Sequence, residues 1–390
     1  MQLEFIGSSM PTIGVEIELQ IIDPESLDLT PKSELLLEKC QILGLDRVKA
    51  EIHQSMLEID SEVSNDVKQC REFLNSRIQQ LNLAANELGL KLAVLGTHPF
   101  QRWSDRLISN QDRYHNLHQK YQWLARRMNV YGLHVHIGVE NGEQALKISN
   151  ALVRYLPHLL ALSANSPYWQ GIDTGMQSSR VNIMESFPLA GIPHQFNHWG
   201  EFKHYCETLL SAGAICSVKD LYWFIRPNLQ FGTIEFRICD ALSSLNETMA
   251  LVALIQSLVV FVSKDIENNP REWMWSKEQQ WIAPDNQYNA ARDGLEAIIT
   301  TDLGGQKQKI FESILQLLER LSPTARSLNC FEELQYINHI ITNGNGAQRQ
   351  RNIFKETQSL RDVVKGSIKE FELNAPMISN QKYHRDRGQA

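Results

Sequence analysis

Ionisable residues recur two positions apart in several short alternating stretches of this 390-residue chain. The pairs are Glu16 and Glu18 in GVEIEL, His134 and His136 in GLHVHIGV, and Glu235 and Arg237 in TIEFR. Because residues i and i+2 of a β-strand project from the same face, each pair would direct two functional groups to one side of a sheet. Glu58 lies in another alternating stretch, MLEIDSEV, and Glu51 precedes it by seven residues. If these strands share a sheet, carboxylates and imidazoles line one of its faces.

Carboxylates with imidazole and without thiolates form an oxygen-rich site, which suits Mg2+, with Mn2+ as the alternative. Carboxylates that converge in this way repel one another, so a closed site of this kind calls for a cation. Substrate anions would bind to arginine, since a guanidinium makes bidentate contacts with phosphate or carboxylate. The candidates are Arg180 in QSSRVN, Arg226 in WFIRPN and Arg237. Together with the five glutamates, these three arginines would give the pocket two net negative charges.

Each pair also has a simpler interpretation. Glu16 and Glu18 would face water on a half-exposed antiparallel sheet. Glu235 and Arg237 would form an ion pair of a kind that is common on protein surfaces. The histidine pair is harder to explain structurally, because its neighbours are apolar and two imidazoles share one face. That pair favours metal, phosphate or proton-transfer chemistry.

The elements that must position these groups are strands and helices mixed over the first 240 residues, followed by a mostly helical third. Alternation and short apolar runs predict strands at 12–22, 56–63, 91–96, 131–139, 221–225 and 232–239. Helical spacing predicts helices at 32–43, 66–88, 112–128, 143–163 with an interruption at Pro157, 201–212, and nearly everywhere after 246. The tract 165–199 is rich in Gly, Pro and aromatic residues, and it is predicted to be a long loop of the kind that covers binding sites.

Composition excludes several classes of protein. With 38 Lys+Arg and 45 Asp+Glu, the net charge of −7 argues against a protein that coats nucleic acid or anionic membranes. The six cysteines include no C-x-x-C pair, which indicates reduced thiols in a cytoplasmic protein. The N-terminus has no signal-peptide pattern, and the apolar run 249–262 is short for a membrane span, so it predicts a buried helix. Phosphate-loop, dinucleotide, zinc-protease and nucleophile-elbow motifs are absent from the sequence.

Five segments, taken in order between residues 14 and 240, together resemble one family. They are GVEIEL, AEIHQSMLEID, GLHVHIGV, SSRVNIMESFPLAGIP and YWFIRPNLQFGTIEFRICD. The set is similar to the carboxylate-amine ligases related to type 2 glutamate-cysteine ligase. The resemblance implies an α+β, glutamine synthetase-like fold, in which a curved and mainly antiparallel sheet of about six strands forms a cradle for ATP and Mg2+, with helices outside. We expect one catalytic domain over 1–375, which is sheet-rich over 1–240 and helical over 246–375. A polar tail is expected over 376–390.

The resemblance also implies roles for individual residues. Metal ligands would be Glu16, Glu18, Glu51, Glu58, His134 and Glu235, and the ATP phosphates would be bound through Glu58, Glu235 and Arg237. Arg237, Arg180 and Arg226 would act in catalysis by compensating phosphoryl charge or holding a substrate carboxylate, and His136 has no assigned role. One departure is Ile192-Pro193-His194, where the family often has two consecutive prolines, and this bears on the amine-side pocket.

The implied reaction is the ATP-dependent formation of an amide through an acyl phosphate. Glutamate with cysteine or a related amine is the default substrate pair, giving a γ-glutamyl product, and the tract 165–199 is where specificity is expected to be decided. Small amino acids are the expected partners, and a homodimer is expected from the general frequency of symmetric dimers. Two alternatives remain at this stage. The first is an amidohydrolase-type barrel that uses His134 and His136 as a metal pair, and the second is a non-catalytic nucleotide-binding regulator.

Overall fold

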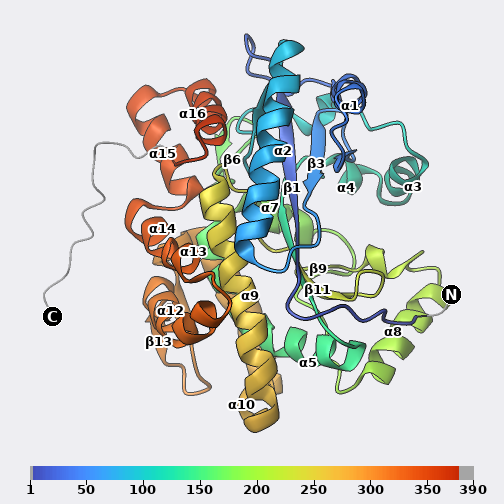
Figure 1. Cartoon of the computed structure of the whole chain (residues 1–390), viewed down its shortest axis with the longest axis vertical. Helices are drawn as coiled ribbons and strands as arrows, with labels where there is room; N and C mark the ends of the chain where they lie inside the picture. Colours follow the sequence, from blue (N-terminus) through green and yellow to red (C-terminus); the bar gives the residue numbers. More distant parts are fainter. Residues whose placement is uncertain (1–2, 377–390) are drawn as a thin grey trace, which may run out of the picture.

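The computed structural model describes residues 3–376, and its central element is a seven-stranded antiparallel sheet (Figure 1). The strands follow the order β10–β11–β5–β1–β3–β2, and β4 pairs with one end of β1. Their bounds are β1 Ile13–Ile22, β2 Val48–Ala50, β3 Met56–Asp60, β4 Lys91–Ala93, β5 Leu133–Gly138, β10 Ile225–Asn228 and β11 Thr233–Phe236. The expected α+β fold with an antiparallel sheet is confirmed.

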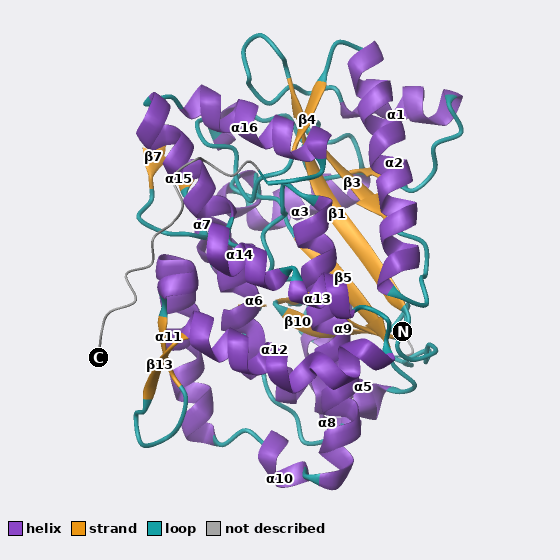
Figure 2. Cartoon of the chain, turned by 60° about the vertical axis from the view of Figure 1, so that its left-hand side comes forward, coloured by secondary structure: helices purple, strands orange, loops and turns teal. Residues whose placement is uncertain are grey.

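Helices cover the sheet and form the last third of the chain (Figure 2). They are α1 Ser33–Ile42, α2 Val67–Glu87, α3 Asp112–Tyr121, α4 Trp123–Arg126, α5 Gly142–Leu152, α6 Leu156–Ser163, α7 Ser179–Glu185, α8 Trp199–Ser211, α9 Leu245–Asn268, α10 Pro270–Trp273, α11 Lys277–Asp293, α12 Ile310–Ser327, α13 Phe331–Gln335, α14 Ile337–Asn343, α15 Gly346–Thr357 and α16 Leu360–Leu373. The break expected near Pro157 is confirmed, because a short 3-10 turn separates α5 from α6 and Pro157 lies in the first turn of α6.

Three sequence predictions of secondary structure are wrong in detail. The tract 165–199 is not a continuous loop, since it contains α7 and the short strands β6 Tyr168–Trp169, β7 Ile172–Asp173 and β8 Ala190–Gly191. The strand predicted at 221–225 is split into β9 Tyr222–Trp223 and β10, and β10 includes Pro227. Proline is tolerated there because β10 is at the edge of the sheet, where a missing N–H costs little. The helical third also contains a hairpin, β12 Ile298–Thr300 with β13 Lys307–Lys309.

Helix α9 is the longest element of the core. By length and composition it could cross a membrane, but 72% of its apolar window is buried within the protein, as in a core helix. It packs against β5, α2, α5 and the helices α12–α14, and Figure 1 shows α2 and α9 side by side over the sheet. The prediction of a buried helix at 249–262 is therefore confirmed.

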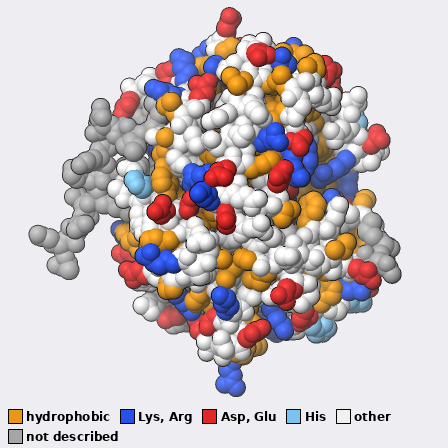
Figure 3. Space-filling view, in the orientation of Figure 1, with side chains coloured by type: hydrophobic (Ala, Val, Ile, Leu, Met, Phe, Trp, Pro, Cys, Tyr) orange, Lys and Arg blue, Asp and Glu red, His pale blue; other side chains and the backbone are white. Residues whose placement is uncertain are grey.

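Figure 3 shows the surface in the orientation of Figure 1, and acidic and basic side chains are interspersed over this face of the molecule.

The C-terminal helices are joined to α9 by a buried ion cluster. The Arg349 guanidinium on α15 donates to both carboxylate oxygens of Glu247 on α9, each at 2.8 Å, and to Glu370 on α16 at 2.8 Å. All three side chains are at most 6% exposed. Removing one partner would leave uncompensated charge in the core.

The single catalytic domain over 1–375 stays a prediction. Of the tail predicted over 376–390, the structure describes only residue 376.

Buried His98 predicts a pH dependence of stability. Its Nδ1 accepts from the backbone N–H groups of Phe100 and Gln101 (3.4 and 3.3 Å), so the proton must reside on Nε2, which donates to the Leu27 carbonyl at 3.1 Å. A second proton would break the Nδ1 contacts, and burial lowers the pKa of His98 to about 3. The unfolded chain binds that proton near pH 6.5, so the stabilisation is present above this pH and is lost as the pH falls.

When the pH is lowered from 7 to 5, protonation of this histidine in the unfolded chain should reduce the free energy of unfolding by about 2 kcal/mol. The measurement is urea unfolding of the wild type and of His98→Asn at both pH values. The variant should lose about 2 kcal/mol less than the wild type over this range. Equal losses in both proteins would contradict the assignment of a neutral His98.

Candidate active site

The polar side chains of the sheet line one cavity of about 390 Å³. Residues from β1, β2, β3, β5, β10 and β11 contribute to its wall, so this face of the sheet is concave. The intervening side chains of β1, Val15, Ile17 and Leu19, belong instead to the hydrophobic core. The sequence-predicted residues that line the cavity are Glu16, Glu18, Glu51, Glu58, His134, His136, Arg180, Arg226, Glu235 and Arg237. The predicted convergence of these groups is thus observed.

Strand register explains why residues distant in sequence meet. Glu16 on β1 pairs with His134 on β5, and Glu18 pairs with Glu58 on β3. On the other side of β5, His136 pairs with Glu235 on β11, which in turn pairs with Arg226 on β10. Directly opposed residues have side chains about 4.5–5.5 Å apart at Cβ. The antiparallel order therefore places carboxylates, imidazoles and arginines in adjacent rows across one face.

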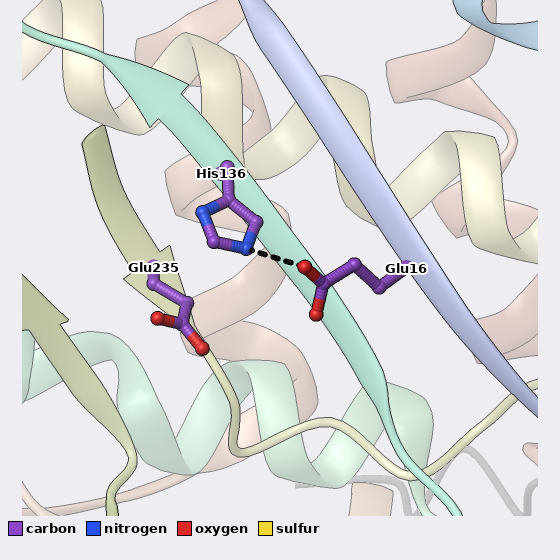
Figure 4. Close-up of side chains that lie close together, drawn as sticks. All are labelled: Glu16, His136 and Glu235. Carbon is purple, nitrogen blue, oxygen red and sulfur yellow. Dashed lines mark ion pairs between the residues drawn. The ribbon is translucent and has the colours of Figure 1, made fainter. Parts of the chain in front are cut away.

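Glu16 lies at the centre of the cluster. Its two oxygens lie 2.9 Å from His134 Nδ1 and 3.3 Å from His136 Nε2, and Figure 4 shows His136 between Glu16 and Glu235. Burial acts to raise the pKa of Glu16, but His136 and His134 outweigh it and hold this pKa well below the usual value. Burial and Arg237 lower the pKa of His134 to about 4, whereas Glu16 outweighs burial and raises the pKa of His136. Without a bound cation, Glu16 therefore favours the protonated form of His136, whereas burial favours the neutral form of His134.

Ligand atoms of these residues are close enough to share cations. One group, within 4.8 Å of one another, comprises Glu16, Glu58 and His134, and a second comprises Glu16, His136 and Glu235. Glu16 belongs to both groups, so its carboxylate could bridge two ions. Neutral imidazole and carboxylate oxygens are compatible with Mg2+ or Mn2+.

Three carboxylates crowd the β1–β3 side of the cavity. Burial and then the charge of Glu51 raise the pKa of Glu18 to about 8, although the Gly132 N–H donates to it. Burial, followed by Glu16 and Glu51, raises the pKa of Glu58 well above its usual value. Burial likewise raises the pKa of Glu51. A bound cation would stabilise all three in the charged form.

Glu235 is held by two arginines on the opposite side. Arg226 binds it through Nε at 2.9 Å and Nη2 at 3.1 Å, and Arg237 Nη1 also donates to it. Burial acts to raise the pKa of Glu235, but Arg226 and Arg237 hold it well below its usual value. Arg226 Nη1 donates further to the carbonyls of Lys219 and Leu221. Arg226 is therefore engaged with Glu235 and the two carbonyls, whereas within residues 3–376 the Arg237 guanidinium bonds to Glu235 alone and lines the cavity.

Arg180 reaches the cavity from α7 and not from an irregular loop. Its guanidinium donates to the carbonyls of Ile238 and Arg237, both at 3.2 Å, and lies 3.8 Å from the buried carboxylate of Asp240. A Cβ atom on Gly132 would lie only 2.2 Å from Arg180 Nη2, so a side chain at this position would displace the guanidinium. Arg180 therefore fixes the backbone that carries Arg237, in addition to bringing positive charge.

The sequence analysis missed three cations of the cavity wall, Lys49, Arg113 and Lys219. Lys49 Nζ lies 3.8 Å from Glu58 and forms a closer ion pair with Asp60. With these residues, six Lys and Arg side chains face five glutamates, so the predicted excess of two negative charges is wrong. Lys49 lies opposite Glu58 in the sheet. Its strand β2 has only three residues, which is too short for strand periodicity to be recognised in the sequence.

Few residues of the tract 165–199 reach the cavity. Within the described part of the chain, Arg180 and Met184 are its contributions to the wall, whereas α3 adds Arg113, Tyr114 and Leu117. His194, at the departure from the family pattern, instead packs against Tyr205 and Trp223, with ring centroids 5.4 and 6.2 Å apart. The prediction that this tract decides specificity stays a prediction.

Comparison with known sequences identifies a family and close relatives. The profile described as "Glutamate-cysteine ligase family 2(GCS2)" matches residues 12–371. A protein of Thermobifida fusca is 38% identical over 384 residues, covering 97% of this chain and 96% of its own length. A protein of Gloeobacter violaceus is 40% identical over 370 residues, covering 93% and 98%. Both carry the name "Putative glutamate--cysteine ligase 2".

Solved structures show the same fold at low sequence identity. A bifunctional glutathione synthetase from Pasteurella multocida superposes with a TM-score of 0.69 and 14% identity, over 93% of this chain and 52% of that one. A glutamate-cysteine ligase from Francisella tularensis, solved in complex with AMP, has a TM-score of 0.66 and 10% identity, over 94% and 90%. At these identities the likeness concerns the fold, and it agrees with the glutamine synthetase-like architecture expected from the sequence.

Proposed function

Because this chain belongs to glutamate-cysteine ligase family 2, a family of carboxylate-amine ligases, we propose that it uses ATP to join the γ-carboxylate of glutamate to an amine. Cysteine is the default amine. The observation that carries the proposal is the concave sheet face, where Glu16 and His136 lie between the Glu58 carboxylate and the Glu235–Arg237 pair. Such a surface suits a polyphosphate that arrives with divalent cations.

The cavity fits the nucleotide and the ions in several respects. Its volume of about 390 Å³ lies within the range of small-molecule sites. The Francisella tularensis enzyme was solved in complex with AMP, which supports the binding of a nucleotide by a protein of this fold. Burial, followed by neighbouring carboxylates, raises the pKa values of Glu18 and Glu58, and a bound cation would lower them again. Glu16, Glu18, Glu51, Glu58, His134 and Glu235 would hold two or three Mg2+ ions, which would neutralise phosphate charge when bound.

The chain's own residues then have distinct tasks in the reaction. An oxygen of the substrate carboxylate attacks the γ-phosphorus of ATP, ADP leaves, and an acyl phosphate forms. The amine nitrogen next attacks the acyl carbon, phosphate leaves, and the nitrogen loses a proton. Arg237 offers its free donors to the oxygens that gain charge, and Arg226 keeps Glu235 in place beside it. No protein nucleophile is required, because the substrate carboxylate attacks ATP itself.

One of the alternative functions is contradicted by the fold. An amidohydrolase-type barrel needs parallel strands that alternate with helices. The observed sheet is antiparallel, and His136 pairs with Glu16 and Thr233. The histidine pair is therefore part of the carboxylate cluster. The other alternative, a regulator that binds nucleotide without turnover, is decided by assay.

The assay combines the purified chain, ATP, Mg2+, glutamate and a pool of amino acids, with mass spectrometry of the products. We expect a new species whose mass equals glutamate plus one amine minus water, together with ADP and phosphate. Omitting glutamate or Mg2+ should abolish both. Nucleotide binding by a folded sample without any new amide, with every amino acid present, would contradict the proposal and support the regulator.

A further inference from the structure

A second cavity lies among the helices, away from the sheet. It has a volume of about 210 Å³, and Arg154, His158, Trp275 and Ser313 are among the residues that line it. The lining residues come from the 3-10 turn Val153–Tyr155 and the adjoining start of α6, from α11 and the segment that leads into it, from the β12–β13 hairpin and from α12. Figure 2 shows α11 and β13 on the side of the molecule away from β1 and β3. Within residues 3–376, it shares no lining residue with the cavity on the sheet.

Several buried polar atoms of this wall have no hydrogen-bond partner among the described residues. They are Nε and Nη2 of Arg154, Nε1 of Trp275 and Nδ1 of His158. The His158 side chain is only 4% exposed, and its other nitrogen lies 2.9 Å from Ser313 Oγ. Buried donors are normally satisfied, since leaving them unpaired costs stability. A ligand in the cavity that draws these side chains toward it would complete their hydrogen bonds.

The charge of the wall selects an anion. Arg154 has no carboxylate within 4 Å in the described chain, and its Nη1 donates to the backbone carbonyl of Glu272 at 3.1 Å. Its guanidinium also stacks on the Trp273 ring, 5.2 Å from the centroid, which fixes the plane of its free donors. Two parallel N–H groups of one guanidinium match the two oxygens of a carboxylate. The one carboxylate of the wall, Asp302, is exposed, and its Oδ1 accepts from the Gln306 N–H.

Much of the remaining wall is apolar, and the polar side chains of Gln279, Asn286, Thr300, Thr301 and Ser313 complete it. Val153, Pro157, Ile282, Ala283 and Ile299 line the cavity together with the rings of Tyr155 and Trp275. A dry protein cavity of roughly 150 Å³ is known to accept benzene. The observed 210 Å³ therefore leaves room for a ring or a branched chain and one carboxylate group.

We propose that this cavity is a second binding site, for a small monocarboxylate with an aryl or branched aliphatic body, in which Arg154 and Trp275 donate to the carboxylate. The site is separate from the proposed ligase function and does not depend on it. Phosphate is a poorer fit, because it has no apolar body for the apolar side chains of the wall to contact.

The test is isothermal titration calorimetry of the full chain with phenylacetate, with its neutral counterpart phenylacetamide and with inorganic phosphate. Phenylacetate should bind at least tenfold more tightly than the other two. Arg154→Met should weaken binding at least tenfold. Trp275→Phe, which keeps the ring and removes the N–H, should weaken it severalfold. Lys365→Met removes a positive charge on an exposed face of α16 and should leave binding unchanged.

Circular dichroism shows whether each variant is folded, and Trp275→Phe keeps the test decisive if Arg154→Met does not fold. The proposal is overturned if millimolar phenylacetate gives no binding heat, or if phenylacetamide binds equally well. It is also overturned if the folded Arg154 or Trp275 variant retains wild-type affinity, since phenylacetate would then occupy another site.

Discussion

Glu16→Gln is expected to lower the kcat of ATP-dependent amide formation by about 10²–10³-fold, the loss typical when one electrostatic contact to the transition state is removed. Glu16 contacts both histidines and belongs to both groups of candidate metal ligands. The amide keeps the shape of the side chain but removes the charge that would bridge two cations. Turnover should not be restored by raising the ATP concentration, and the Mg2+ concentration needed for half-maximal rate should rise.

The matched control is Glu34→Gln, which removes an exposed carboxylate from the first turn of α1. It should retain the wild-type kcat and the wild-type response to Mg2+. If the Glu16 variant is folded and turns over at the wild-type rate, the cluster around Glu16 is not the cation site.

Arg237→Gln is expected to reduce kcat by about 10³-fold or more, in line with other arginines that compensate charge on a transferred phosphoryl group. Arg226 remains to pair with Glu235, so the buried carboxylate is not left without a partner. Arg237→Lys keeps the charge but loses the planar fork, and we expect an intermediate rate. Steady-state kinetics of both variants, with KM for ATP measured separately from kcat, are the relevant data.

Arg292→Gln serves as the comparison, because Arg292 is partly exposed and pairs with its neighbour Asp293. An unchanged kcat in Arg237→Gln, or a loss of the same size in Arg292→Gln, would contradict the role given to Arg237. A rise in KM alone would place Arg237 in ground-state binding of ATP and not in the transition state.

The strands that carry the site could be predicted because their periodicity is local. In β1, Val15, Ile17 and Leu19 are buried while Glu16 and Glu18 face the cavity, and this pattern is present in the sequence itself. The same holds for the pair His134 and His136 on β5. What these stretches could not reveal is the order of strands, since pairing is decided by contacts between distant segments. The family resemblance supplied the antiparallel architecture, and the order of the strands comes from the structure.

Shorter elements escaped prediction for the opposite reason. The strand β2 has three residues and α7 has seven, which is too few for a period to be recognised. Lys49 on β2 was missed with its strand, and Arg113 carries no signal that separates it from any solvent-facing arginine. The pocket therefore has more positive charge than the sequence indicated, and a balance inferred from motif residues alone was wrong.

Arg226 illustrates a further limit. The sequence shows an arginine beside a proline, which suits an anion-binding residue. The structure shows that its donors are directed to Glu235 and to two backbone carbonyls. Only the three-dimensional arrangement distinguishes an arginine that positions a carboxylate from one that is free to bind substrate. For this reason the proposed function assigns charge compensation to Arg237.

The central claim is that this chain activates a carboxylate with ATP, and oxygen-isotope transfer tests it most directly. Glutamate labelled with ¹⁸O in its γ-carboxylate is incubated with the chain, ATP, Mg2+ and the amine identified by the product assay. An acyl phosphate requires that one labelled oxygen leaves with the phosphate, so inorganic phosphate should carry one ¹⁸O for each amide formed. Amide formation with unlabelled phosphate, or with AMP and pyrophosphate as products, would contradict the account.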